Sequence, residues 1–174
     1  MSARNLIIQS KVTHLCTTDD PADTLEWHKI IRDDQSFPVQ VLPAWRPEAA
    51  MKIGSMDFVN DMKRLKNAAG VEINSFRTLK EALKIRLAFF EGMGCRASDH
   101  SLDYAMYVPA SEEEVEQIFA KALNGEAISY EDGLKYKTAF LLFIGKEYKR
   151  LGWAMQLHYG VKRDNNQKLY RAYG

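Results

Sequence analysis

VQVLPAWRP, residues 39–47, is a short apolar run that gives way at once to a polar cluster stiffened by two prolines. Three other apolar runs end in the same manner: residues 12–16 before TTDDP, a shorter run after Gly94 before RASDH, and residues 153–157 before HYGVKRDNN. Helical patterns separate the four runs. This alternation predicts parallel β/α structure, in which the carboxyl ends of all strands face one way and form the site.

The spacing of apolar residues and the capping signals predict the individual elements. We expect four strands, at residues 11–17, 37–42, 95–98 and 153–159. We expect helices at 3–10, 20–34, 47–68 (in two pieces broken near Gly54), 76–93, from Ser111, 129–151 and 167–173. Asp20 is the expected N-cap of the second helix, and Pro21 suits its first turn. No domain linker interrupts the chain, so residues 1–174 read as one segment with a helical elaboration at about 101–151.

Composition narrows the class of protein. The chain has 174 residues, of which 46% are hydrophobic and 27% charged, and this is ordinary for a globular protein. A net charge of +1 provides no field that would attract nucleic acid or an anionic membrane. No stretch approaches the ~20 apolar residues of a membrane span, and the start does not read as a signal peptide. We therefore expect a cytoplasmic protein whose two cysteines, Cys16 and Cys95, are free, buried thiols.

Arg46 is the first candidate site residue, because its planar guanidinium suits a carboxylate or phosphate and two prolines stiffen its loop. The alternative is a surface Arg46 stacked on Trp45. Asp19 follows the first strand and is free to bind a substrate hydroxyl, whereas Asp20 has its capping role. Asp99 and His100 follow the third strand, and only one of them should face the site, because neighbouring residues of an extended segment point in opposite directions.

The fourth strand carries Gln156 and His158 on one face, so that they can project into a site together. A hydrogen-bonded core histidine is the alternative for His158. His14 and His28 read as packing or surface residues. No local metal-binding motif, Gly-rich phosphate loop or nucleophile elbow is present in the sequence.

Seven short sequence motifs, taken in order along the chain, resemble those of the uronate (glucuronate) isomerases of the amidohydrolase superfamily. They are CTTDDP (16–21), LEWH (25–28), VLPAWRP (41–47), GCRASDH (94–100), YKTA (136–139), GKEY (145–148) and GWAMQLHYG (152–160). The resemblance implies a bacterial, cytoplasmic enzyme of hexuronate breakdown. It would interconvert D-glucuronate with D-fructuronate and D-galacturonate with D-tagaturonate, as an aldose–ketose isomerase working through a cis-enediol. The implied fold is a distorted (β/α)8 barrel of the TIM type with inserted helices.

The resemblance also implies roles for individual residues. Arg46 would pair with the uronate carboxylate, with Trp45, Asp19 and Gln156 beside the substrate. His158, Asp99 and His100 would line the mouth of the barrel as candidate catalytic residues. The family binds a divalent metal, often zinc, through residues that would lie outside this chain. The chain corresponds to the middle of a family member, so we expect a partial barrel of about four strands.

Such a segment has open strand edges, and we expect it to recruit the missing parts of the barrel or to form an oligomer. Two other readings remain open at this point. One is a metal-dependent hydrolase on the same scaffold, because fold alone does not fix the reaction. The other is a half-barrel without catalytic activity.

Overall fold

Four short parallel strands run through the molecule. The computed structural model describes residues 2–160 and 165–173. The strands are β1 (His14–Cys16), β2 (Gln40–Leu42), β3 (Ala97–Leu102) and β4 (Ala154–Tyr159). β1 pairs with β2 and β3 with β4, in both cases in parallel. Bridges from Trp45 to Asp19 and to Ser98 join the two pairs. The predicted parallel α/β arrangement is thus confirmed.

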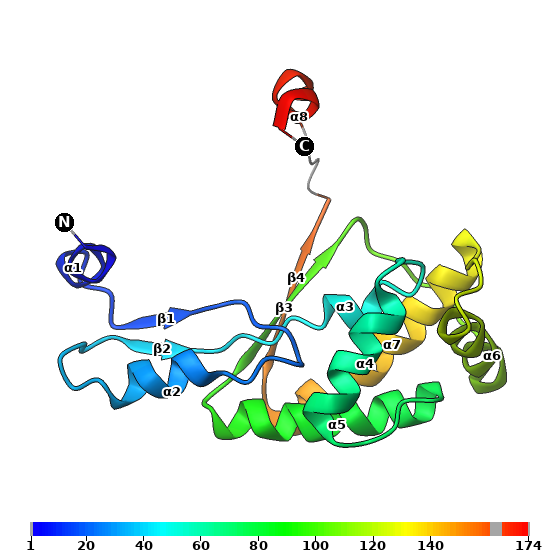
Figure 1. The fold of residues 1–174 in the computed structure, drawn as a ribbon, viewed down its shortest axis with the longest axis horizontal. Coiled ribbons are helices and arrows are strands. Elements are labelled where there is room, and N and C mark those ends of the chain that lie inside the picture. The colour runs from blue at the N-terminus through cyan, green and yellow to red at the C-terminus, as the bar shows by residue number, and fades with distance from the viewer. Residues whose placement is uncertain (1, 161–164, 174) are drawn as a thin grey trace.

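The helices divide into two groups around these strands. Figure 1 shows α2 beside β1 and β2 in an arm on one side of β3 and β4, with α3, α4, α6 and α7 mainly on the other side and α5 running beneath the strands. Their bounds are α1 (Ala3–Gln9), α2 (Glu26–Asp33), α3 (Glu48–Met51), α4 (Phe58–Ala69), α5 (Phe76–Gly92), α6 (Glu112–Leu123), α7 (Tyr130–Leu151) and α8 (Gln167–Tyr173).

Most helix ends lie where the sequence signals predict them. Ser111 and Glu114 form a capping box at the start of α6, because each side chain accepts a hydrogen bond from the other residue's backbone N–H. Ser129 caps α7, and Gly152 ends it in the left-handed conformation, at φ 70°. The two helical pieces between residues 47 and 68 are α3 and α4, which are broken around Gly54 as expected.

The start of α2 was predicted wrongly. The helix begins at Glu26, and Asp20 instead accepts a hydrogen bond from the backbone N–H of Ala22. The cause is Arg86 on α5, which is 7% exposed and donates to the carbonyl oxygens of Pro21 and Asp23, each at 2.7 Å. Those carbonyls are therefore engaged outside any helix. A tertiary contact from a residue 65 positions away overrides the local signal.

The strand limits also differ from the prediction. β1 and β2 are shorter than expected, at three residues each, whereas β3 runs to Leu102. Asp99 and His100 therefore lie within β3 and not after it. Burial also corrects the prediction for the cysteines: Cys95 is buried, whereas Cys16 is exposed, and both are free. Burial raises the pKa of the Cys95 thiol to about 11.

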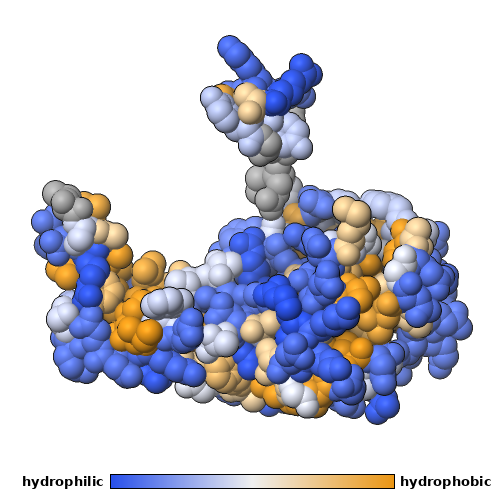
Figure 2. Space-filling view, in the orientation of Figure 1, coloured by the Kyte–Doolittle hydropathy of each residue, from blue (hydrophilic) through white to orange (hydrophobic). Residues whose placement is uncertain are grey.

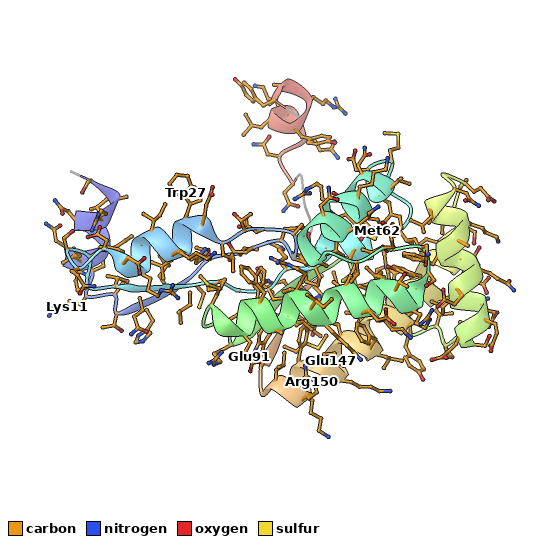
Figure 3. The ribbon with its side chains drawn as sticks, turned by 60° about the horizontal axis from the view of Figure 1, so that its bottom comes forward. Lys11, Trp27, Met62, Glu91, Glu147 and Arg150 are labelled. Atoms are coloured by element: carbon orange, nitrogen blue, oxygen red, sulfur yellow. The ribbon has the colours of Figure 1, made fainter. Side chains whose placement is uncertain are left out.

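The core lies between the strands and helices α3 to α7. Trp45 is fully buried there, with its ring edge-on to Phe90 at 4.9 Å and to Trp153 at 6.4 Å. Figure 3 shows Glu147 and Arg150 on α7, where that helix passes beneath α5. The Glu147 carboxylate lies 2.8 Å from Nε of Arg150 and 3.5 Å from Nζ of Lys84 on α5. The Lys84–Glu147 ion pair thus supplements the apolar contact of these two helices, whereas the pair with Arg150 lies within α7.

Exposed apolar side chains concentrate away from this core. Figure 2 shows apolar surface over the arm, where α1, β1 and α2 expose Leu6, Ile8, Leu15, Trp27 and Ile30. Every residue of β4 is exposed, among them Met155, Leu157 and Tyr159. Over the described residues, no helix is both long and apolar enough to cross a membrane.

Candidate functional site

Strand register places the predicted polar residues on one face of β3 and β4. Asp99 is the partner of Gln156, and Ser101 is the partner of His158. Partners in register share a face of a sheet, and alternate residues along a strand do as well. Asp99, Gln156 and His158 therefore project together, as the sequence predicted for Gln156 and His158, while His100 projects to the opposite face.

Asp99 and His158 form the centre of the group. Oδ1 of Asp99 lies 2.6 Å from Nδ1 of His158. The two atoms are close but poorly aligned, because Oδ1 is buried and makes no well-directed hydrogen bond within the described residues. Nε2 of Gln156 lies 2.9 Å from Nε2 of His158. The imidazole thus sits between a carboxylate and an amide, an arrangement suited to holding or moving a proton.

Arg46 reaches the same group from the segment after β2. Its Nη1 lies 3.5 Å from Oδ2 of Asp99, and its Nε donates to Oε1 of Glu48 at 2.9 Å. Thr18 donates to Oδ2 of Asp99 at 3.2 Å, which brings in the segment after β1. The segment after β1, the segment after β2 and strand β4 therefore all reach Asp99 on β3. Arg46 and its two carboxylates carry a local charge of −1 while His158 is neutral.

Sequence reasoning missed Thr18 and Glu48. Thr18 directly precedes Asp19 within CTTDDP, and Glu48 follows Arg46 by two residues, one position beyond VLPAWRP. Their hydroxyl and carboxylate are ordinary for a cap or a first helical turn, and nothing local distinguished them. Only the distances to Asp99 and Arg46 mark them as members of the group.

Asp19 lies outside this group. Its side chain accepts a hydrogen bond from Thr17 at 2.6 Å and lies 3.7 Å from Nε2 of His28 on α2. Asp19 and Trp45 are bridge partners and so share the face that looks toward the helices. The Asp19 side chain thus does not join Arg46 and Asp99, although its backbone carbonyl accepts a hydrogen bond from the backbone N–H of Arg46 at 2.9 Å. His28 is buried, in keeping with a packing residue.

Trp45 and His100 also face the helices. Because Trp45 is fully buried against aromatic rings, it does not stack on Arg46, and that alternative for Arg46 is wrong. His100 is fully buried, and its Nε2 lies 2.9 Å from the hydroxyl of Tyr148 on α7. Burial lowers the pKa of His100 to about 4, so the ring is neutral at pH 7. Neither residue joins the group around Asp99.

A cavity of about 320 Å³ adjoins the group through Glu48 and Ser101. Its remaining walls come from α3, from the end of β3 and from α7: Met51, Lys52, Leu102, Asp103, Met106 and Lys137. This volume lies in the range of small-molecule sites. Charged, hydroxyl and thioether groups line it together, so it suits a small polar molecule better than an apolar one.

The residues around Asp99 offer few metal ligands. The part of the chain that the structure describes holds no group of three or more His, Cys, Asp or Glu side chains placed to bind a metal. Asp99 and His158 supply two donors at most, and Arg46 adds a positive charge 3.5 Å from Asp99. A divalent ion needs more ligands than this. These residues by themselves do not fit the metal implied by the resemblance.

Parallel strands, a converging Arg–Asp–His group and a polar cavity beside them define a segment of an α/β protein with a candidate small-molecule site. The family profile described as glucuronate isomerase matches residues 1–174. The chain belongs to the glucuronate isomerase family.

Individual relatives agree with this assignment. The chain is 53% identical over 174 residues to the uronate isomerase of Lachnospira eligens and 57% identical over 166 residues to that of Lachnoclostridium phytofermentans. It covers 37% and 36% of those proteins, and they cover 100% and 95% of the chain. The chain thus spans little more than a third of the length of these relatives.

Two solved structures share the fold. The crystal structure of uronate isomerase from Thermotoga maritima matches with a TM-score of 0.89 and 30% identity, over 100% of this chain and 38% of that one. The glucuronate isomerase of Caulobacter crescentus matches with a TM-score of 0.84 and 25% identity, over 97% of this chain and 35% of that one.

Proposed function

We propose that this chain is the substrate-holding part of a uronate isomerase that interconverts D-glucuronate with D-fructuronate and D-galacturonate with D-tagaturonate. Its family membership carries the proposal, together with the convergence of Arg46, Asp99 and His158 beside the cavity. No observation favours the alternative of a metal-dependent hydrolase.

The proposal includes the setting of the chain. Residues 1–174 would be one segment of a (β/α)8 barrel, with β1 to β4 as consecutive strands and the helices between residues 101 and 151 as an elaboration. The divalent metal would be held by residues outside this chain. We place the enzyme in the cytoplasm, because the substrate is a metabolite of sugar-acid breakdown.

Each residue of the group would have a defined task. Aldose–ketose isomerisation moves a proton from C2 to C1 through a cis-enediol. His158, placed by Asp99 and Gln156, would accept or donate a proton at the substrate's hydroxyls. Arg46 would bind the carboxylate at C6 and fix an open-chain substrate that is otherwise flexible. Glu48 and Thr18 would hold Arg46 and Asp99 in place.

The test grafts residues 1–174 into the Lachnospira eligens enzyme in place of its matching segment, which is possible because the match covers the whole chain. Arg46→Ala should lower kcat/KM for D-glucuronate by about 30- to 100-fold, the loss of a charge-assisted contact of about 2 kcal/mol or more. Arg96→Ala, at the amino end of the same strand layer, is the matched control, because Arg96 contacts only backbone carbonyl oxygens of Glu91 and Cys95 among its described hydrogen bonds.

The result can contradict the proposal in two ways. An unchanged kcat/KM in the Arg46→Ala graft would remove Arg46 from the site. A graft without isomerase activity, in a host that is active before grafting, would remove the function. The isolated chain should show no isomerase activity, and full activity of a monomer would contradict its role as a part of a site.

A further inference from the structure

Both ring nitrogens of His158 face a polar side chain. Nδ1 lies 2.6 Å from Oδ1 of Asp99, and Nε2 lies 2.9 Å from the amide nitrogen of Gln156, two residues earlier on β4. The other three histidines each face a hydroxyl, that of Thr13, Thr17 or Tyr148. A hydroxyl can donate or accept, whereas a carboxylate accepts and an amide nitrogen donates. The surroundings of His158 therefore specify which ring nitrogen carries the hydrogen.

Asp99 places this hydrogen on Nδ1. Its other oxygen, Oδ2, faces two donors, the hydroxyl of Thr18 at 3.2 Å and Nη1 of Arg46 at 3.5 Å. Because both groups donate, Asp99 acts as an ionised acceptor with no hydrogen of its own to offer. The contact with His158 is poorly aligned but short, and a bare Nδ1 would set two lone pairs against each other at 2.6 Å. Nδ1 therefore carries the hydrogen.

Gln156 keeps Nε2 of the same ring free of a hydrogen. Its amide nitrogen can only donate, so the ring nitrogen that it faces has to accept. With the hydrogen on Nδ1, the ring is then neutral. An amide turned the other way would present its oxygen to an N–H at Nε2, and His158 would then be an imidazolium. The orientation of the Gln156 amide and the charge of His158 are therefore linked.

The geometry points to Gln156 as a positioning residue that holds His158 neutral, with its lone pair at Nε2. The charged groups around the ring are Arg46, Glu48 and Asp99, which sum to −1 and by themselves favour an imidazolium. The donating amide opposes that charge. Nε2 is consequently the nitrogen that can accept a proton, and the half-exposed ring leaves it within reach of a small molecule.

The consequence for catalysis rests on the proposed isomerase function. A substrate hydroxyl replaces the amide as the donor to Nε2. Its O–H bond then breaks, the electron pair stays on the substrate oxygen, and the proton forms an N–H bond at Nε2. The resulting imidazolium lies against the carboxylate of Asp99. The amide oxygen of Gln156 can accept a hydrogen bond from the new N–H, so one uncharged side chain serves both states of the ring.

The test reads the ring nitrogens of His158 by ¹⁵N NMR in the 174-residue chain at pH 7.5. The signals, identified by their loss in His158→Gln, should show a hydrogen on Nδ1 and none on Nε2. Gln156→Glu should convert the ring to the imidazolium at the same pH, because a carboxylate only accepts. Leu157→Glu is the matched control: it adds the same charge on the opposite face of β4 and should leave the ring neutral. Circular dichroism checks that each variant is folded.

The outcomes separate this assignment from the proposed function. A hydrogen on Nε2 in the unsubstituted chain, or equal spectra of Gln156→Glu and Leu157→Glu, would overturn it. In the grafted enzyme, Gln156→Glu should lower kcat about tenfold at pH 7.5 relative to the unsubstituted graft, and less at pH 9, where the ring gives up its extra proton. A merely structural defect would not recover in this way. An active graft whose kcat does not recover would reject the positioning role, whereas an inactive graft would reject the function and leave the NMR result standing.

Discussion

Arg46 owes its orientation to two carboxylates, one from the first turn of α3 and one from β3. Nε donates to Glu48 at 2.9 Å, and Nη1 lies 3.5 Å from Asp99. These contacts position the guanidinium, but they also offset its charge. The sequence indicated Arg46 as an anion-binding residue, whereas the contact with Asp99, 53 positions away, became visible only in the tertiary structure.

Glu48→Gln tests this balance. The amide oxygen can still accept the hydrogen bond from Arg46, but the negative charge is gone, so a bound uronate carboxylate meets less repulsion. We expect KM for D-glucuronate in the grafted enzyme to fall about threefold, with kcat within twofold. Glu48→Ala, which also removes the hydrogen bond, should raise KM. A higher KM for Glu48→Gln would show that the negative charge of Glu48 favours substrate binding, and it would contradict this prediction.

His100 makes the stability of the chain depend on pH. Burial lowers its pKa from 6.5 to about 4, so below pH 6.5 the unfolded state binds a proton that the folded state does not. The contribution of neutral His100 to stability is therefore fully present above about pH 6.5 and is lost as the pH falls toward 4. We expect a loss of about 2 kcal/mol between pH 7 and pH 5, measured by urea unfolding.

The matched variants are His100→Gln and His14→Gln. His100→Gln should reduce that loss substantially, because the titrating group is gone. His14 is exposed, so His14→Gln should leave the difference between pH 7 and pH 5 unchanged. The same pH dependence in the His100→Gln variant would contradict the assignment.

At the scale of elements, the helices with their own capping signals were predicted well, and α2 was not. Ser111, Ser129 and Gly152 act through neighbouring backbone groups, so local sequence suffices. α2 begins late because Arg86 on α5 binds the carbonyls before it, a contact that no local pattern indicates. β3 runs longer than predicted because β4 pairs with it over six residues.

The start of α5 has a cap supplied by another helix. Glu116 of α6 accepts hydrogen bonds from the backbone N–H groups of Phe76 and Arg77, at 2.7 and 2.8 Å. Glu116→Ala should lower the free energy of unfolding by about 1–2 kcal/mol, because two N–H groups at the positive end of the helix lose their acceptor. Glu116→Gln should retain part of this stability.

The comparison is made by urea unfolding against Gln117→Ala. Gln117 is exposed on the same helix, and its substitution should change stability by less than 0.5 kcal/mol. If Glu116→Ala were as mild as Gln117→Ala, the cap would contribute nothing to stability.

At the scale of the whole molecule, the sheet remains open beside β4. All six residues of this strand are exposed, and only β3 pairs with it among the described residues. An uncovered strand with apolar side chains is a ready surface for association. We therefore expect the isolated chain to self-associate as its concentration rises, which light scattering would detect.

Leu157→Lys should reduce this association, because it places a charge on the exposed strand. Leu142→Lys is the matched control, since Leu142 is similarly exposed but lies on α7. A monomer at all concentrations would contradict the expected association, and equal effects of both substitutions would locate the contact elsewhere.

Local sequence patterns predicted the order of strands and helices, most helix ends, and the candidates Arg46, Asp99, Gln156 and His158, because periodicity, caps and strand-end clusters involve only neighbouring residues. Tertiary structure decided which of the candidates meet. Alternation within the strands turned Trp45, Asp19 and His100 toward the helices. Parallel pairing and the bridges at Trp45 brought Thr18 and Arg46 to Asp99, and Glu48 contacts Arg46. The reason is physical: a site at strand ends depends on register and facing, and both are set by pairing between segments far apart in the chain.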